Sequence, residues 1–192
     1  MRRAELRRKT RETDIALSLN LEGTGKIKID TGVGFFDHML TALANHAGFD
    51  LELTCKGDLE VDCHHTIEDV GIALGDALCR ALGDRRGIER FAVAFVPMDE
   101  SLARCVLDLS GRGMLVYDAK FDNQYCGTME TCMAEEFFRA LADNAKMTLH
   151  LANLYGRNDH HKLEGMFKAT ARALKCAVSV TSDRLPSTKG VL

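Results

Sequence analysis

The sequence predicts an α+β protein built from two similar halves. Strand-like alternation of apolar and polar residues comes before helical patterns, and this order occurs twice along the 192 residues. A short motif, two adjacent histidines followed three residues later by a glutamate, also occurs once in each half. Helices packed on one face of each small sheet would bury both apolar patterns. We therefore expect one domain made of two β-β-β-α-β-α repeats, at about residues 1–85 and 86–192.

The first half shows clear strand and helix signals. Four apolar side chains share one face of the segment 14–21, which is typical of a half-buried strand. Gly48 and Gly83 follow helical patterns, and glycine is favoured just beyond a helix end. Asp62 can cap the second helix. The expected elements are strands at 14–21, 26–30 and 51–55, a helix at 35–47 and a helix from 62 to about 82.

The second half repeats this order. Its expected elements are strands near 90–96, 102–109 and 114–121, a helix at about 131–144, a strand at 147–154 and a helix from 160 to about 180. The segments 42–53 and 140–151 align at an offset of 98 through shared alanines and leucines. Such matches arise easily by convergence. After a gap of two residues, however, His64-His65-x-x-Glu68 aligns with His160-His161-x-x-Glu164, and this match indicates an internal duplication.

Composition excludes several classes of protein. The net charge of −3 argues against a general affinity for nucleic acid or anionic membranes. No apolar run approaches the roughly 18 residues needed to span a bilayer, and no apolar segment follows the basic start to make a secretory signal. The seven cysteines are odd in number and contain no C-x-x-C pair, so we expect neither a disulfide framework nor a zinc ribbon. A cytoplasmic location is the simplest interpretation.

The repeated histidine motif has the spacing of a metal site. His64 and Glu68 lie four residues apart, so one helix face presents both to the same ion. His65 lies about 100° around the helix and faces elsewhere. The same holds for His160 with Glu164, and for His161. Two such helices therefore suggest two ions, each taking a pair of ligands from one helix and a single ligand from the other.

The offset between the halves also predicts a fourth ligand for each ion. His38 aligns with Glu136, and both residue types bind divalent metals. One ion would then take His38, His65, His160 and Glu164, and the other Glu136, His161, His64 and Glu68. Imidazole with some carboxylate suits Mn, Fe or Zn. Sequence order leaves open whether one subunit or two supply the ligands of a site.

Other interpretations of the motif exist. A single histidine at a helix start is usually a cap or a surface residue, although two repeated clusters are poorly explained in that way. A dinuclear metallohydrolase could use the same ligands to activate water. A protein that only binds or stores metal would need the clusters but no anion-binding residues.

Five separated motifs make the chain resemble the imidazoleglycerol-phosphate dehydratase family over almost its whole length. These motifs are Gly34-Phe35-Phe36-Asp37-His38-Met39-Leu40, Asp62-Cys63-His64-His65-Thr66-Ile67-Glu68-Asp69-Val70, Asp108-Leu109-Ser110-Gly111-Arg112, Asn158-Asp159-His160-His161 with Phe167-Lys168-Ala169, and Pro186-Ser187-Thr188-Lys189-Gly190. One departure concerns Glu136, because many family members have a histidine ligand there.

The resemblance implies a hydro-lyase of histidine biosynthesis. It would convert D-erythro-imidazole-glycerol phosphate to imidazole-acetol phosphate, through an imidazolate bound by two Mn²⁺ ions. It also implies a duplicated fold of the ribosomal protein S5 domain 2-like type. The expected assembly is a homo-24-mer with its metal sites at subunit interfaces.

The resemblance assigns further residues by position. It points to Glu12, His46 and Asp99 as groups that contact the reacting hydroxyls, acting with the metal-site carboxylates Glu68 and Glu164. Lys168 lies four residues after Glu164 and hence on the metal-facing side of the helix. The residues that resemble the family's phosphate contacts are Arg90, Arg112, Ser187, Thr188 and Lys189, together with Lys168. Without the resemblance, Glu12 would be interpreted as a solvated strand residue and the Ser-Thr-Lys segment as a frayed tail.

Overall fold

The alternating segments form two four-stranded sheets of identical topology in the computed structural model, which describes residues 2–190. The first half consists of β1 (Arg3–Lys9), β2 (Thr13–Asn20), β3 (Ile27–Asp30), α1 (Gly34–Ala47), β4 (Asp50–Gly57) and α2 (His64–Leu82). The second consists of β5 (Phe91–Met98), β6 (Ser101–Asp108), β7 (Met114–Asp118), a short hairpin of β8 (Tyr125–Cys126) and β9 (Met129–Glu130), α3 (Met133–Ala145), β10 (Thr148–Tyr155) and α4 (Asp159–Ala177).

Both sheets pair their strands in the same way. The first has the order β1-β2-β4-β3, with the last pair parallel and the others antiparallel. The second has the order β5-β6-β10-β7 and again ends in a parallel pair. The parallel pair follows from the helix that crosses between β3 and β4, or between β7 and β10. The predicted fold class, a duplicated α+β architecture, is therefore confirmed.

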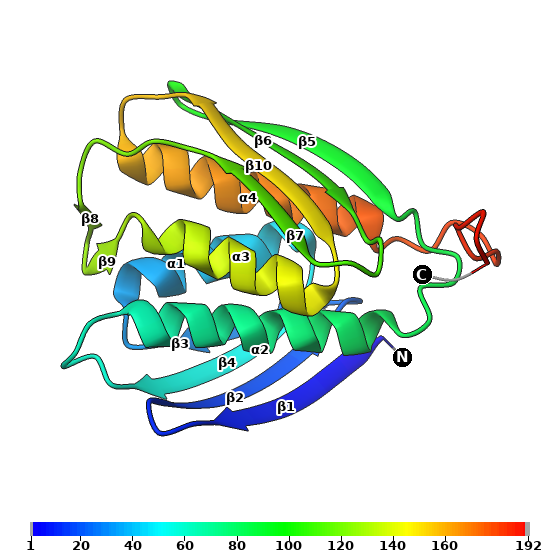
Figure 1. Ribbon diagram of the computed structural model, residues 1–192, viewed down its shortest axis with the longest axis horizontal. Helices are drawn as coiled ribbons and strands as arrows, with labels where there is room; N and C mark the ends of the chain where they lie inside the picture. The colour runs from blue at the N-terminus through cyan, green and yellow to red at the C-terminus, as the bar shows by residue number, and fades with distance from the viewer. Residues whose placement is uncertain (1, 191–192) are drawn as a thin grey trace.

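The helices form a layer between the two sheets (Figure 1). α2 packs on β1 and β2 and pairs with α3, whereas α4 packs on β5 and β6 and pairs with α1. Each half thus contributes one helix to each pair. All four helices begin at the same end of the molecule, next to the β8–β9 hairpin (Figure 1). This arrangement brings the two histidine motifs to one end of the fold, because each motif stands at the start of its helix.

Four phenylalanines join the halves at the centre of the helix layer. Phe36 of α1 meets the ring of Phe137 of α3 edge-on at 5.2 Å between centroids. Phe137 stacks on Phe167 of α4 at 5.3 Å, and Phe138 lies 4.8 Å from the same ring. All four side chains are fully buried. Aromatic contacts at these distances add to the hydrophobic gain, so the halves share one core rather than two.

Most predicted element boundaries agree with the structure. Gly48 ends α1 with a left-handed backbone at φ 74°, and its N–H bonds to carbonyls of the last helical turn. Cys63, not Asp62, occupies the N-cap position of α2, but Asp62 still accepts a hydrogen bond from the N–H of His64 at 2.7 Å. α4 ends at Ala177, earlier than the predicted residue 180, and β1 and the β8–β9 hairpin were not predicted. Among the described residues, none of the helices is long and apolar enough to cross a membrane.

Candidate metal and substrate site

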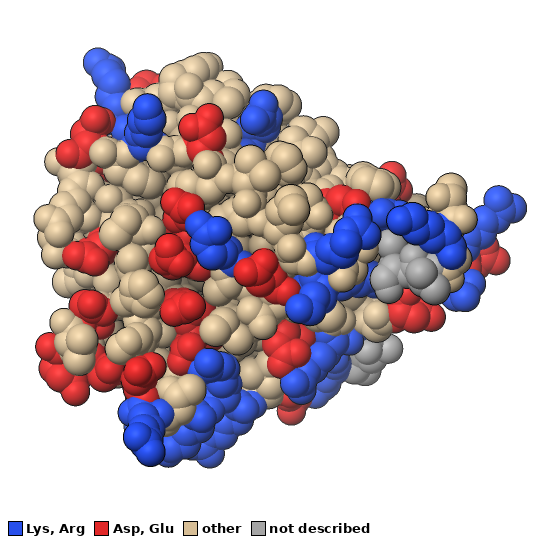
Figure 2. Space-filling view, in the orientation of Figure 1, with Lys and Arg blue, Asp and Glu red and all other residues tan. Residues whose placement is uncertain are grey.

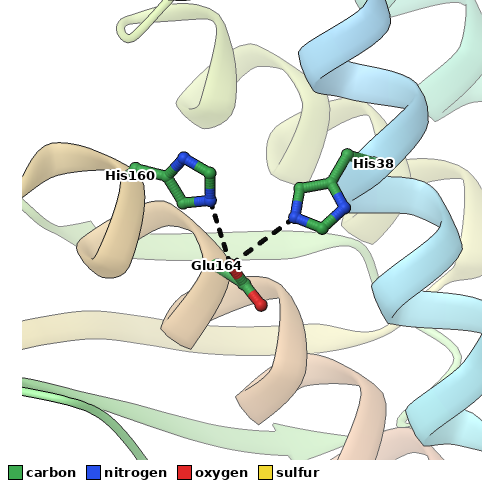
Figure 3. A group of neighbouring side chains, drawn as sticks. All are labelled: His38, His160 and Glu164. Carbon is green, nitrogen blue, oxygen red and sulfur yellow. Dashed lines mark hydrogen bonds and ion pairs between the residues drawn. The ribbon is translucent and has the colours of Figure 1, made fainter.

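Three predicted metal ligands meet between α1 and α4 (Figure 3). Nε2 of His160 lies 3.1 Å from Oε2 of Glu164, one turn further along α4. Nε2 of His38 on α1 lies 3.6 Å from the same oxygen. One ligand atom of each residue lies within 4.8 Å of the others. The i, i+4 spacing on α4 and the parallel packing of α1 therefore build this group, which we call the first ligand group.

The surroundings of the first ligand group hold its side chains in place. Asn158 caps α4, and its side chain accepts the N–H groups of both His160 and His161. The ring of Phe35 meets the His160 imidazole edge-on, with 5.0 Å between centroids. The Glu164 side chain is only 10% exposed, while the two imidazoles are about half exposed (51% and 45%). Two imidazoles and a carboxylate converging from one open side are a donor set that suits Mn²⁺, Fe²⁺ or Zn²⁺.

Lys168 and His46 extend the first ligand group along the two helices. Nζ of Lys168 lies 2.6 Å from Oε1 of Glu164. Burial raises the pKa of Glu164, but the hydrogen bond and charge of Lys168, together with the hydrogen bond to His160, outweigh it, so the pKa lies below its ordinary value. His46, near the end of α1, has its pKa lowered by burial and by the charges of Lys168 and Arg172. The imidazole of His46 is therefore neutral at physiological pH.

The equivalent group of the other helix pair is less complete. Nε2 of His64 lies 3.5 Å from Oε2 of Glu68 on α2, which matches the pair on α4. Glu136 on α3 instead lies 3.8 Å from the guanidinium of Arg139. Within residues 2–190, the first ligand group is the one set of three or more such residues close enough to hold an ion together.

The second histidine of each motif faces two carboxylates. Nε2 of His65 lies 3.7 Å from Glu12, and Nδ1 lies 3.0 Å from Asp58. In the other half, Nε2 of His161 lies 3.6 Å from Asp99 and Nδ1 lies 2.7 Å from Glu100. The pKa of each imidazole is raised, chiefly by its hydrogen bond to Asp58 or Glu100. His65 does not join the first ligand group within one chain.

The residues predicted to bind phosphate are divided between the middle and the far end of α4. Lys168 lies along the helix, whereas the backbone N–H of Arg90 bonds to the carbonyl of Ala177, the last residue of α4. The guanidinium of Arg90 bonds to both carboxylate oxygens of Asp108 at 2.7 and 3.1 Å. It also donates to the carbonyl of Pro186 at 2.6 Å, which holds the C-terminal segment against β5.

This far end of the molecule is rich in cations. Arg112 lies exposed in the loop after β6, and Thr188 and Lys189 are exposed in the C-terminal segment, next to a half-buried Ser187. Figure 2 shows lysine and arginine side chains gathered where this segment lies. Such a group of cations can bind a phosphate.

Sequence reasoning did not identify Asp58, Glu100 or Asp108 as parts of the site. Glu100 follows a predicted site residue directly, and Asp108 belongs to one of the recognised motifs, so position alone gave a weak signal for both. Nothing in the local pattern marks Asp58, because its role depends on how the loop before α2 folds back onto the β1–β2 turn.

The duplicated fold and its paired histidine helices define a class of α+β proteins that present two equivalent His–Glu pairs at one end of a helix layer. The family model described as imidazoleglycerol-phosphate dehydratase matches residues 31–174. The dehydratase of an Exiguobacterium species is 58% identical over 191 residues, which cover 99% of this chain and 98% of the relative. That of Streptococcus sanguinis is 55% identical over the full length of both chains.

Solved structures give the same result. The crystal structure of the enzyme from Staphylococcus aureus matches with a TM-score of 0.83 at 37% identity, covering 93% of this chain and 99% of that one. The structure from Pyrococcus furiosus matches with a TM-score of 0.85 at 37% identity, covering 97% and 100%. The chain belongs to the imidazoleglycerol-phosphate dehydratase family, hydro-lyases of histidine biosynthesis. The resemblance found in the sequence motifs is thereby confirmed.

Proposed function

We propose that this chain dehydrates D-erythro-imidazole-glycerol phosphate to imidazole-acetol phosphate and uses two Mn²⁺ ions to do so. The observation that carries the proposal is the first ligand group, in which a histidine of the first half meets a histidine and a glutamate of the second. Because this ligand set takes residues from both halves, an ion bound there would need both copies of the repeat. The division at about residues 1–85 and 86–192 within a single catalytic domain is part of the proposal.

Two sets of residues would hold the ions. The first is His38, His65, His160 and Glu164, and the second is Glu136, His161, His64 and Glu68. The geometry of the first ligand group supports the first set, and the His64–Glu68 pair supports the second. When bound, the two ions supply Lewis acidity to the two ring nitrogens of the substrate.

The chain's own carboxylates are the groups that we propose to move protons. Glu12 and Asp99 stand at matching turns, β1–β2 and β5–β6, each facing Nε2 of the second histidine of a motif. The leaving hydroxyl must gain a proton and the adjacent carbon must lose one, and two carboxyl groups can carry out these transfers. A neutral His46 can accept a hydrogen bond from a substrate hydroxyl. Glu68 and Glu164 hold the ring end of the substrate by fixing their metal-ligand pairs.

The distance between the two ends of α4 supports a site shared by subunits. From His160 to Ala177 the helix rises roughly 25 Å at about 1.5 Å per residue. The three-carbon chain that joins imidazole to phosphate is far shorter than this. Arg90, Arg112, Ser187, Thr188 and Lys189 of one chain would therefore bind a phosphate whose imidazole lies at the metal end of another chain, with Lys168 between them.

The outer face of the second sheet supports assembly into a larger particle. It carries large apolar side chains that are open to solvent in the single chain, with Val93 60% exposed. The members of this patch are Phe91, Val93, Phe95, Val106, Met114 and Val116. An apolar patch of this kind on a sheet face marks a protein interface. We infer a homo-24-mer, which is the assembly that the family resemblance implies. We also propose a cytoplasmic location, in keeping with the seven free cysteines.

One assay tests the function. The metal-free protein is given imidazole-glycerol phosphate with and without Mn²⁺, and the enolisable ketone product is measured. We expect ketone to form only with the metal. Release of inorganic phosphate without ketone would show a metallohydrolase instead, and metal uptake with no reaction would show a storage protein.

A second experiment tests the shared site. His160→Ala and Lys189→Ala remove opposite ends of the proposed site, so His160→Ala alone should be inactive and Lys189→Ala alone should be slow at substrate concentrations below its raised KM. Co-assembled particles that contain both variants should recover activity, because some interfaces pair two intact ends. Failure of every mixed particle to recover activity, with assembly verified by light scattering, would contradict a site built between subunits.

A further inference from the structure

Two carboxylates that no motif marks reach the same ring atom of the two equivalent histidines. Oδ2 of Asp58 lies 3.0 Å from Nδ1 of His65, and its Oδ1 lies at 3.2 Å. Oε2 of Glu100 lies 2.7 Å from Nδ1 of His161. We propose that Asp58 and Glu100 are positioning residues that hold these rings with Nε2 free to bind an ion. This inference rests on the proposed function, which makes His65 and His161 metal ligands.

The physical basis is the choice of tautomer. A neutral imidazole carries one N–H, and a carboxylate can only accept a hydrogen bond. Asp58 and Glu100 therefore place the N–H of each ring on Nδ1, which leaves the lone pair on Nε2. Nε2 is the atom that faces Glu12 in one half and Asp99 in the other, the side on which the substrate is proposed to lie. Carboxylates behind metal-binding histidines orient the ring and raise its basicity.

Glu100 is itself firmly held. Its Oε1 accepts the backbone N–H groups of Arg157 and Asn158 at 2.9 and 2.8 Å, just before α4 begins. Together with the bond to His161, these bonds join the β5–β6 turn to the start of α4. One side chain fixes the position of the helix start and the orientation of its second histidine.

Asp58 also holds the ring of its histidine, but it lies in a different loop from the one that would match Glu100. It comes from the loop between β4 and α2, not from the strand turn. Its backbone N–H donates to the carbonyl of Glu12 at 3.1 Å, and its carbonyl accepts the N–H of Val61 at 2.8 Å. Asp58 therefore links the turn that carries Glu12 to the ring of His65. The two halves reach one chemical arrangement from different loops, which indicates that the contact to Nδ1 matters rather than the loop that supplies it.

Each carboxylate would act on a different ion. In the proposed ligand sets His65 belongs to the first ion and His161 to the second. Removal of Asp58 should therefore weaken binding of the ion that His65 holds and leave binding of the other ion largely unchanged, and removal of Glu100 should do the opposite. A general loss of folding would weaken binding of both ions together, so the selectivity separates a positioning role from a structural one.

The first readout is the tautomer in the metal-free protein. Histidine side chains are labelled with ¹⁵N, and magic-angle-spinning spectra are recorded at a pH about three units above the ordinary imidazole pKa, where neutral rings predominate. Signals of His65 and His161 are assigned by His65→Asn and His161→Asn. We expect both rings as the Nδ1–H tautomer in the wild type. Asp58→Ala should shift only His65 toward the Nε2–H form, and Glu100→Ala only His161.

The second readout is Mn²⁺ affinity, titrated by electron paramagnetic resonance. Each alanine variant should lose about 10-fold to 100-fold in affinity at one of the two ions. Asp58→Asn and Glu100→Gln keep a neutral acceptor and should fall between wild type and alanine. Glu60→Gln serves as the matched control, because Glu60 is an exposed carboxylate in the same loop as Asp58.

The outcomes separate this inference from the proposed function. Wild-type tautomers and affinities in both alanine variants would overturn it. If an alanine variant fails to fold, wild-type values in both readouts for the Asn or Gln variant overturn it instead. If the wild type binds no Mn²⁺ or makes no ketone, the proposed function fails, while the spectra of the metal-free protein still decide whether the two carboxylates set the tautomers.

Discussion

Nε2 of His38 lies 3.6 Å from Oε2 of Glu164, and this contact joins α1 of the first half to α4 of the second. Neither half holds the first ligand group alone, since His160 and Glu164 come from one and His38 from the other. The contacting phenylalanines Phe36, Phe137 and Phe167 lie in the same helix layer and keep these helices in place. Packing of the duplicated halves therefore creates the candidate site.

Glu164→Gln should weaken Mn²⁺ binding by more than tenfold at one ion. The change removes the negative charge that two imidazoles and Lys168 share, while it keeps the size of the side chain. Binding is followed by titration of the metal-free protein. Glu22→Gln, an exposed carboxylate paired with Arg2, is the control and should bind Mn²⁺ like the wild type. Equal affinities in the two variants would remove Glu164 from the ligand set.

Lys189→Ala should raise KM strongly, by about tenfold or more, while metal content stays normal. Lys189 is exposed in the C-terminal segment, far along the fold from the first ligand group, so its loss should leave the ligands undisturbed. A charged contact to phosphate contributes roughly 1.5–3 kcal/mol, and each 1.4 kcal/mol corresponds to a factor of ten. Steady-state kinetics with metal analysis test this. An unchanged KM would exclude Lys189 from phosphate binding.

Elements with a clear apolar periodicity could be predicted from the sequence, and β1 shows why others could not. In β1 the charged residues Arg3, Glu5, Arg7 and Lys9 alternate with only two apolar ones, Ala4 and Leu6. The next inward position is Arg8, which pairs with the nearly buried Asp69 instead of entering the core. A strand whose inner face ends in an ion pair lacks the alternation that marks a strand.

Some residues of the candidate site could likewise be predicted from the sequence, and others could not. Ligand pairs at i, i+4, such as His160 and Glu164, follow from helix geometry and were predictable. Glu136 was aligned with His38, but in the structure its carboxylate lies 3.8 Å from Arg139, a neighbour on its own helix. Contacts of Asp58 and Glu100 depend on how loops fold back, and no periodicity encodes that. Sequence spacing thus predicts which side chains share one face of a helix. It does not predict which side chains of a distant loop will contact them.

Arg85→Met should destabilise the chain by about 3 kcal/mol. Arg85 lies between the halves and is 5% exposed, and its guanidinium donates to the carbonyls of Leu109, Ala145 and Lys146. Two of these carbonyls belong to the end of α3, where a cation is favourable. Leaving such acceptors buried without donors costs about 1–3 kcal/mol each, although relaxation recovers part of this.

Urea unfolding of Arg85→Met measures the loss. Arg86→Met is the matched control, because Arg86 is the exposed neighbour and its contacts are to Asp84 and to the carbonyl of Asp183. It should change stability by less than about 0.5 kcal/mol. Equal effects of the two substitutions would show that Arg85 does not hold the halves together.

Asp50 should make stability depend on pH in the acid range. Its Oδ1 accepts the N–H groups of Thr24, Gly25 and Lys26 at 2.6–2.9 Å. The bond from Lys26 is the largest cause of a pKa below the ordinary 3.8. Because the folded-state pKa is the lower one, the stabilisation is present above pH 3.8 and is lost as the pH falls through the folded-state pKa.

The check on Asp50 is the melting temperature of the wild type and of Asp50→Asn as a function of pH. The difference should be constant at neutral pH and should shrink as the pH falls below 3.8, because protonation makes the wild type resemble the variant. A difference that stays constant down to the lowest pH at which both proteins fold would contradict the role of the charge.

Two glycines allow α2 and α3 to pack closely, and the second of them should not tolerate alanine. Gly71 and Gly75 lie one turn apart on α2, so both face α3. A Cβ at Gly75 would stand 2.7 Å from the carbonyl oxygen of Leu141 and 2.9 Å from the backbone nitrogen of Ala145. Backbone atoms cannot rotate away, so the helices must separate. Gly75→Ala should therefore lower the free energy of unfolding by about 1–3 kcal/mol, despite the better helix propensity of alanine.

Gly165 on α4 provides the opposite case in the same helix layer. A Cβ there would meet its nearest neighbour, Cβ of Ala103, at 3.4 Å, which is an ordinary contact. Gly165→Ala should thus be neutral or stabilise the fold by up to about 1 kcal/mol, since alanine loses less backbone entropy than glycine in a helix. Urea unfolding of both variants under one condition compares them directly. If Gly75→Ala were as stable as Gly165→Ala, the approach of α2 to α3 would not depend on the missing side chain, and helix propensity alone would explain both results.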